Sequence, residues 1–193
     1  MTGTAIRPNG IDVQALTETV QAVQDEPGQA RFTFRARTHW QEGTYNIGEI
    51  GSFKHAGTED RSRAASFVLH GDEPPVLLGE NRGPNAVELL LQALAFCYAV
   101  GYAANAAARG IELTQMDYEV EGDIDVRNFL GLPGDRPGFT RIRAVGHVAS
   151  PNATPEQLQE LCQYVQDTSP VRDVLVNGVP VETTLDVTEE ARR

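Results

Sequence analysis

The sequence contains few of the residues on which common functional sites depend. It has two cysteines, Cys97 and Cys162, and four histidines among 193 residues, and none of them shows the spacing of a zinc motif. No glycine-rich phosphate loop or dinucleotide fingerprint is present either. We therefore expect no metal and no cofactor. Two cysteines are also too few for a disulfide framework, which favours reduced thiols and a cytoplasmic location.

Positive charge is also scarce. The chain has 16 lysines and arginines against 27 aspartates and glutamates, a net charge of -11. An acidic surface is repelled by phosphate groups, so we expect neither nucleic acid nor an anionic membrane as a partner. The first residues lack the basic segment and apolar run of a secretory signal. The 40% hydrophobic and 22% charged residues are typical of a globular protein.

One long helix is predicted over residues 85–109. Asn85 is a favourable N-cap, Glu88 three residues later completes a capping box, and Gly110 suits the position just after the end. Between these ends the residues are apolar or small on every side, so we expect protein to surround the helix. Its length is close to the ~20 residues of a membrane span. A membrane span is the weaker alternative, because the helix is rich in alanine and contains polar residues.

The rest of the chain predicts an α+β fold, with antiparallel sheets around the buried central helix in a single domain of residues 1–193. Residues 31–40 alternate, with Phe34 and Trp40 on a face that we expect to meet the core and arginines on the other. A last strand is expected over residues 179–187. The other predicted parts are an amphipathic helix (10–27), a β-meander (30–71), the central helix (85–109) and a second β region (112–187) that includes a helix (154–168).

Cys97 lies in the middle of the predicted central helix. A cysteine in such a position is most often a small core residue. A reactive thiolate needs a cation or a helix N-terminus beside it, and Cys97 is about three turns from the start of its own helix. Activation must therefore come from another element, for which Arg35, Arg37 and Arg82 are candidates. Glu88 lies on the opposite side of a straight helix from Cys97 and is better explained as a helix cap.

Residues 72–75 and 79–97, which read DEPP and GENRGPNAVELLLQALAFC, resemble the loop and central helix of the OsmC/Ohr superfamily. These are the osmotically inducible and organic hydroperoxide resistance proteins. The resemblance implies an intertwined homodimer in which each chain buries the other's central helix. It also implies a thiol-dependent peroxidase that acts on organic hydroperoxides. Cys97 matches the attacking cysteine, while Arg37 is a loose match to the arginine that supports it.

The chain departs from this family at two positions. Active members carry a second cysteine in a Cys-Pro step, where this sequence has Ser169-Pro170. A serine cannot close a disulfide, and Cys162 lies ~10 Å back along the same predicted helix, too far to replace it without rearrangement. The supporting glutamate is also displaced, since Glu88 is one position closer to Cys97 than in peroxidases of the Ohr type.

Two hypotheses follow from the sequence. In the first, the protein is a peroxidase with one catalytic cysteine, and an external thiol reduces the oxidised Cys97. In the second, the protein is not catalytic and binds a small apolar molecule at the dimer interface, around Cys97, Phe96, Tyr98 and Trp40. We favour the first, because Cys97 is present although its usual partner is replaced by Ser169.

Overall fold

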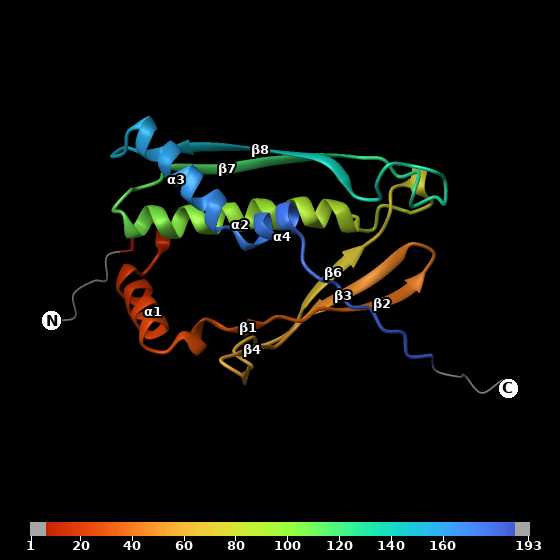
Figure 1. The fold of residues 1–193 in the computed structure, drawn as a ribbon, viewed down its shortest axis with the longest axis horizontal. Helices are drawn as coiled ribbons and strands as arrows, with labels where there is room; N and C mark the ends of the chain where they lie inside the picture. The colour runs from red at the N-terminus through yellow and green to blue at the C-terminus, as the bar shows by residue number, and fades with distance from the viewer. Residues whose placement is uncertain (1–6, 188–193) are drawn as a thin grey trace.

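The computed structural model describes residues 7–187, and its helices and strands are arranged around the long helix α2 (Figure 1). The helices are α1 (Val13–Asp25), α2 (Ala86–Ala108), α3 (Pro155–Thr168) and α4 (Pro170–Asn177), with short 3-10 helices at Pro8–Gly10, Pro27–Ala30 and Pro75–Leu77. The strands are β1 (Phe32–Thr33), β2 (Arg37–Glu42), β3 (Tyr45–Ile50), β4 (Phe53–His55), β5 (Thr58–Asp60), β6 (Phe67–Gly71), β7 (Gln115–Ile124) and β8 (Phe139–Ala149).

The N-terminal strands form two small sheets, where the sequence had predicted one meander. Strands β2, β3 and β6 pair in that order, and the hairpin of β4 and β5 pairs instead with β1. The expected strand over residues 31–40 is divided, because residues 34–36 pair with no neighbour. Its apolar face does not meet the core of this chain, since Phe34 and Trp40 are 66% and 69% exposed. That part of the prediction is wrong for a single chain.

Helix α2 begins as predicted. The Asn85 side chain accepts the Glu88 backbone N–H, and the Glu88 carboxylate accepts the Asn85 backbone N–H, which completes the capping box. The chain leaves the helix through Gly110, whose φ of +69° is the left-handed conformation that glycine adopts at low cost. Among the described residues, α2 alone is long and apolar enough to cross a membrane, a weak indication that core helices also give.

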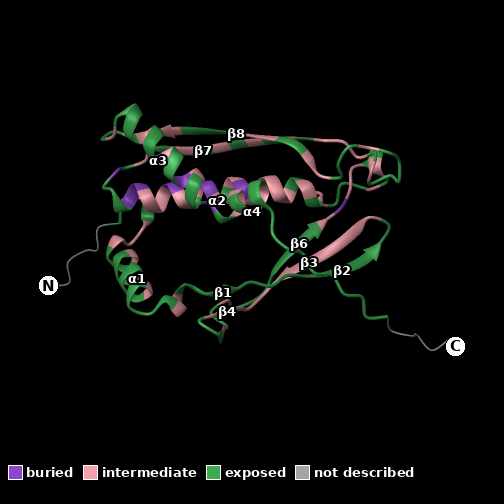
Figure 2. Cartoon of the chain, in the orientation of Figure 1, coloured by how far each residue is buried: buried purple, intermediate pink, exposed green. Residues whose placement is uncertain are grey.

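Only one side of α2 is buried within the chain. Strands β7 and β8 and helix α3 cover that side, where Tyr98, Tyr102 and Ala106 are buried (Figure 2). On the open side, Phe96 is 64% exposed and Val100 is 69% exposed. The prediction that protein surrounds the helix is therefore met on one side and not on the other. The open side faces the N-terminal strands across the molecule in Figure 1.

The hydrophobic core lies in the C-terminal half. Its buried residues come from α2, from α3 and from the segment that follows α2, and no residue before Leu94 belongs to the described core. Thr154 and Gln157 form a second capping box at the start of α3. Strands β7 and β8 pair antiparallel over nearly their whole length. These elements confirm the α+β class and place its packed layer on one side of α2.

The last strand expected over residues 179–187 is not formed. These residues are exposed and pair with no described strand, although Val179, Val181, Leu185 and Val187 keep the alternation that suggested one. Alternation favours a strand only where a sheet edge is available for pairing. Within one chain this segment pairs with none of the described sheet edges.

The loop before α2 is organised around the buried carboxylate of Asp72. It accepts the Thr44 hydroxyl at 2.6 Å and the backbone N–H groups of Glu73, Glu80 and Arg82 at 2.9 to 3.1 Å. These four donors, the Thr44 hydroxyl above all, hold the pKa of Asp72 well below its usual value. Gly79 is required for close approach, because a Cβ there would lie 1.8 Å from the Glu73 carbonyl oxygen.

We expect Asp72→Asn to lower the midpoint of thermal unfolding by several degrees at pH 7, because an amide cannot accept all four hydrogen bonds. A carboxyl with a lowered folded-state pKa stabilises the protein above its unfolded pKa of about 4 and loses that effect as the pH falls further. The difference between the wild type and Asp72→Asn should therefore shrink below pH 4. Asp117→Asn is the control, since Asp117 is exposed and, among the described residues, its side chain accepts a hydrogen bond from Gln115 alone. A difference that grows as the pH falls would contradict this account.

Candidate active site

Cys97 and Ser169 meet at the contact between α2 and α4. The Cys97 Sγ lies 3.1 Å from the Ser169 Oγ, although 72 residues separate them in the chain. Cys97 is half-buried, and Ser169 is only 4% exposed. The Ser169 Oγ also accepts the backbone N–H of Arg172 at 3.1 Å. A hydroxyl that accepts there keeps its own proton, which it can donate to the sulfur.

Local sequence explains why Ser169 stands at this place. Pro170 ends α3, since proline cannot continue a helix, and then occupies the first position of α4. Ser169 is the N-cap of α4, the position that serine favours. The N-terminus of α4, where the positive end of the helix dipole lies, is therefore beside Cys97. A sulfur anion is stabilised by a hydroxyl donor and by a helix N-terminus, and the structure places both beside Cys97.

The structure does not bring the other predicted site residues to Cys97 within one chain. Arg37 lies in β2, exposed, opposite Glu49 in the strand pairing. Glu88 is exposed and is engaged in the capping box of α2. The other candidate arginines are held elsewhere, Arg35 by the Glu59 carboxylate and Arg82 by those of Glu42 and Glu80.

Cys162 is half-buried in α3, and both thiols are free. The Cys162 Sγ lies 3.4 Å from the Gln166 side-chain amide, and its neighbours include Gln166 and Tyr118. Ser169, not Cys162, is the residue whose side chain bonds to the Cys97 sulfur. Among the described residues, no three His, Cys, Asp or Glu side chains are placed together to hold a metal ion.

A cavity of about 740 Å³ lies between α2, β8 and the α3–α4 pair, and we call it the α2–β8 cavity. Tyr98, Tyr118 and Cys162 line it, whereas Cys97 does not. Burial raises the pKa of Tyr98, and the positive charge of Arg172 opposes that rise. Burial also raises the pKa of Tyr118, which lies beside Cys162.

Sequence reasoning missed both the Ser169–Cys97 contact and this cavity. A signal for the first was present, because serine followed by proline is a typical start of a helix. No signal in the sequence indicated that this new helix would begin against Cys97, or that α4 would border a cavity.

The fold and the site define a thiol-containing α+β protein built around a central helix. A model of the OsmC family, described as OsmC-like protein, matches residues 79–184, more than half of the chain. The chain therefore belongs to the OsmC-like protein family, as the sequence had suggested. None of the curated proteins matches it.

Solved structures share this fold at low sequence identity. An OsmC-like protein from Mycoplasma pneumoniae is 17% identical, with a TM-score of 0.56 over 75% of this chain and 88% of that one. An organic hydroperoxide resistance protein OsmC from Legionella pneumophila is 16% identical, with a TM-score of 0.52 over 76% and 90%. An organic hydroperoxide resistance protein from Elizabethkingia anophelis is 14% identical, with a TM-score of 0.54 over 77% of this chain and 91% of that chain. These similarities confirm the fold.

The contact between Cys97 and Ser169 predicts that a disulfide can be built at this point. We expect Ser169→Cys to form a disulfide between Cys97 and the introduced thiol under mild oxidation, because the two side-chain atoms already lie 3.1 Å apart and an S–S bond needs about 2.05 Å. Peptide mapping by mass spectrometry without reduction should detect it. Thr168→Cys is the matched control, since Thr168 is exposed and bonds to the Tyr164 carbonyl. Equal cross-linking in both variants would show that the contact does not direct the bond.

Proposed function

We propose that the protein is a peroxidase that reduces organic hydroperoxides through Cys97, with an external thiol as the reductant. The observation that supports it is the 3.1 Å contact between the Cys97 sulfur and the Ser169 hydroxyl at the N-terminus of α4. That surrounding suits a thiolate, the form of cysteine that attacks peroxides. The hydroperoxide resistance proteins of Legionella pneumophila and Elizabethkingia anophelis, which share the fold, add support by their names.

In the proposed reaction, the Cys97 thiolate attacks the terminal oxygen of the hydroperoxide. An S–O bond forms, the O–O bond breaks, and the leaving alkoxide takes a proton and departs as an alcohol. The sulfur is thereby oxidised by two electrons to a sulfenic acid. An external thiol then displaces water to give a mixed disulfide, and a second thiol releases Cys97 in its reduced form. Ser169 cannot perform the resolving step, because its oxygen forms no disulfide.

The open side of α2 favours an apolar substrate. Phe96 precedes Cys97, and Val100 lies about one turn further along the helix; both are exposed. The alternative, an apolar ligand held by Cys97, Phe96, Tyr98 and Trp40 together, receives less support. Tyr98 is buried and faces the α2–β8 cavity, whereas Phe96 is on the open side. These residues do not form one pocket within a chain.

We also propose that the protein is a homodimer. Burial of a large apolar side chain contributes about 1.5–3 kcal/mol, and one chain leaves Phe34, Phe96 and Val100 mostly exposed. The N-terminal strands add nothing to the core, and residues 179–187 form an extended segment without a partner strand. A second copy that lays its N-terminal strands on α2 would cover these surfaces. The same arrangement would carry Arg37 toward the other chain's thiol.

The peroxidase proposal predicts that the purified protein consumes an organic hydroperoxide, such as cumene hydroperoxide, in the presence of dithiothreitol. Cys97→Ser should abolish this activity, and Cys162→Ser should retain it. Ser169→Ala should lower the second-order rate constant about tenfold, because a hydrogen bond to a charged group contributes about 1.5–3 kcal/mol. Dimedone should label Cys97 in the peroxide-treated wild type. Equal, low rates for the wild type and Cys97→Ser would reject the proposal.

The dimer predicts a mass in solution of twice 21.0 kDa by light scattering. Val100→Glu should reduce that mass to a single chain or lower solubility, because it places a charge on the open side of α2. Gln159→Glu is the matched control, since it adds the same charge at an exposed polar position of α3, away from the open side of α2. A wild type that remains a single chain at micromolar concentration would contradict the dimer.

A further inference from the structure

Tyr98 is a buried tyrosine whose hydroxyl forms no hydrogen bond with any described residue. It is only 6% exposed, and it lines the α2–β8 cavity. Tyr102, about one turn further along α2, differs, because its hydroxyl donates to the Leu158 carbonyl. Among the described residues, every side-chain nitrogen or oxygen that is sealed from solvent has a hydrogen-bond partner. The unpartnered Tyr98 hydroxyl is therefore not sealed, and we infer that it opens into the cavity that its side chain lines.

This hydroxyl is available as an uncharged donor. Burial raises the pKa of Tyr98, so the hydroxyl keeps its proton at neutral pH. The positive charge of Arg172 acts on the same group, which disfavours a cation beside it. Buried polar groups in folded proteins are nearly always hydrogen-bonded. An acceptor atom that enters the cavity can therefore form a hydrogen bond that the described chain leaves unmade.

Tyr98 belongs to a group of uncharged polar residues that contact one another and all line the cavity. The rings of Tyr98 and Tyr118 have their centroids 5.3 Å apart and are tilted by 44°. Tyr118 in turn lies beside Cys162, whose sulfur is 3.4 Å from the amide nitrogen of Gln166. These contacts join α2, β7 and α3, and we call the four residues the tyrosine wall.

The rest of the cavity suits a small molecule with an apolar body. Leu90 and Leu94 line it from α2, Ile142 from β8 and Leu175 from α4, among polar residues of β8 such as Thr140. The volume of about 740 Å³ lies within the roughly 300–1,000 Å³ of small-molecule sites. Such sites combine apolar contact with a few polar groups that fix the orientation of the ligand. The Tyr98 hydroxyl is such a group.

We propose that the α2–β8 cavity binds a small uncharged aromatic ketone, whose carbonyl oxygen accepts a hydrogen bond from the Tyr98 hydroxyl. The two tilted tyrosine rings offer an aromatic body the edge and face contacts that aromatic groups prefer. The leucines of α2 pack against the rest of it. This site goes beyond the proposed peroxidase and does not depend on it, because Cys97 does not line the cavity.

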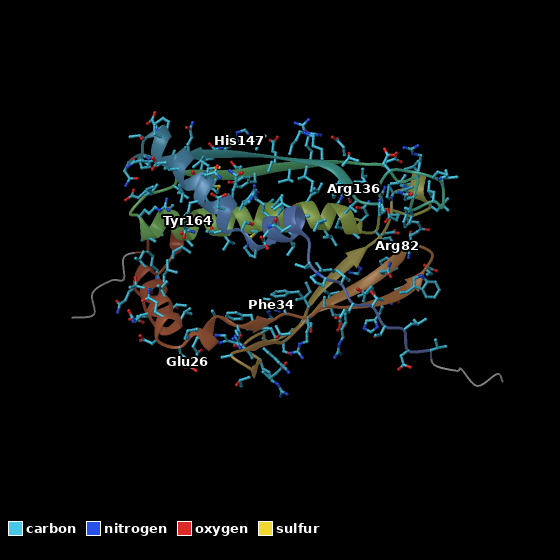
Figure 3. The ribbon with its side chains drawn as sticks, in the orientation of Figure 1. Glu26, Phe34, Arg82, Arg136, His147 and Tyr164 are labelled. Atoms are coloured by element: carbon cyan, nitrogen blue, oxygen red, sulfur yellow. The ribbon has the colours of Figure 1, made fainter. Side chains whose placement is uncertain are left out.

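Calorimetry on the full-length protein with benzophenone and diphenylmethane tests the proposal, because the two molecules differ only in the carbonyl oxygen. Benzophenone should bind the wild type about fivefold more tightly, the effect of one neutral hydrogen bond. Tyr98→Phe should abolish this preference while leaving the binding of diphenylmethane unchanged. Tyr164→Phe is the matched control: Tyr164, labelled on α3 in Figure 3, is 43% exposed and does not line the cavity. The anion 4-benzoylbenzoate should bind no more tightly than benzophenone, because the tyrosine wall is uncharged.

Two further measurements examine the hydroxyl and the location of the ligand. Tyr98→Phe should leave the midpoint of thermal unfolding unchanged, whereas Tyr102→Phe should lower it, because only the Tyr102 hydroxyl has a partner in the folded chain. Cys162 belongs to the tyrosine wall, so benzophenone should slow its alkylation by iodoacetamide in the Cys97→Ser background.

Five results would each overturn the proposal. Benzophenone fails to bind, which would leave the cavity to water, or diphenylmethane binds the wild type as tightly. Tyr164→Phe removes the preference as Tyr98→Phe does, or 4-benzoylbenzoate binds more tightly than benzophenone. Cys162 is alkylated at the same rate with and without benzophenone. A lowered unfolding midpoint for Tyr98→Phe would also count against it, since the hydroxyl would then have a partner within the folded chain.

Discussion

Helix α2 carries apolar or small residues around most of its circumference, and one chain covers only one of its sides. On the covered side, α3, β7 and β8 form the core, and the other side leaves Phe96 and Val100 in contact with solvent. The N-terminal strands, with Phe34 and Trp40 exposed, contribute nothing to this core. Burial of apolar surface is the dominant favourable contribution to folding. The arrangement of the whole chain therefore depends on what lies against the open side of α2.

The site follows from the same geometry. Cys97 sits where α4 meets α2, and the chain reaches that point because Pro170 ends one helix and starts the next. The N-cap serine satisfies a backbone N–H and the sulfur at once. A residue that caps a helix is thereby also the immediate neighbour of the thiol. The Ser169 side chain therefore both stabilises the start of α4 and contacts the thiol.

Local signals in the sequence were sufficient for the elements that local interactions specify. The capping box of α2 and the helix expected over residues 154–168 agree with the sequence pattern, because caps and hydrophobic periodicity act over a few residues. The resemblance of residues 79–97 to the loop and central helix of the OsmC/Ohr superfamily indicated the family of the chain. The pairing of β4 and β5 with β1, the unpaired segment 179–187 and the contact of Ser169 with Cys97 depend on distant parts of the chain, or on surfaces outside one chain.

The serine at position 169 also determines how long an oxidised sulfur would persist. In the proposed reaction, a sulfenic acid at Cys97 has no neighbouring thiol to convert it at once into a disulfide. It waits for a thiol from solution, and meanwhile a second peroxide can oxidise it irreversibly to a sulfinic acid. Such a protein works best where peroxide is scarce and small thiols are plentiful. At high peroxide concentration it would be inactivated by its own substrate.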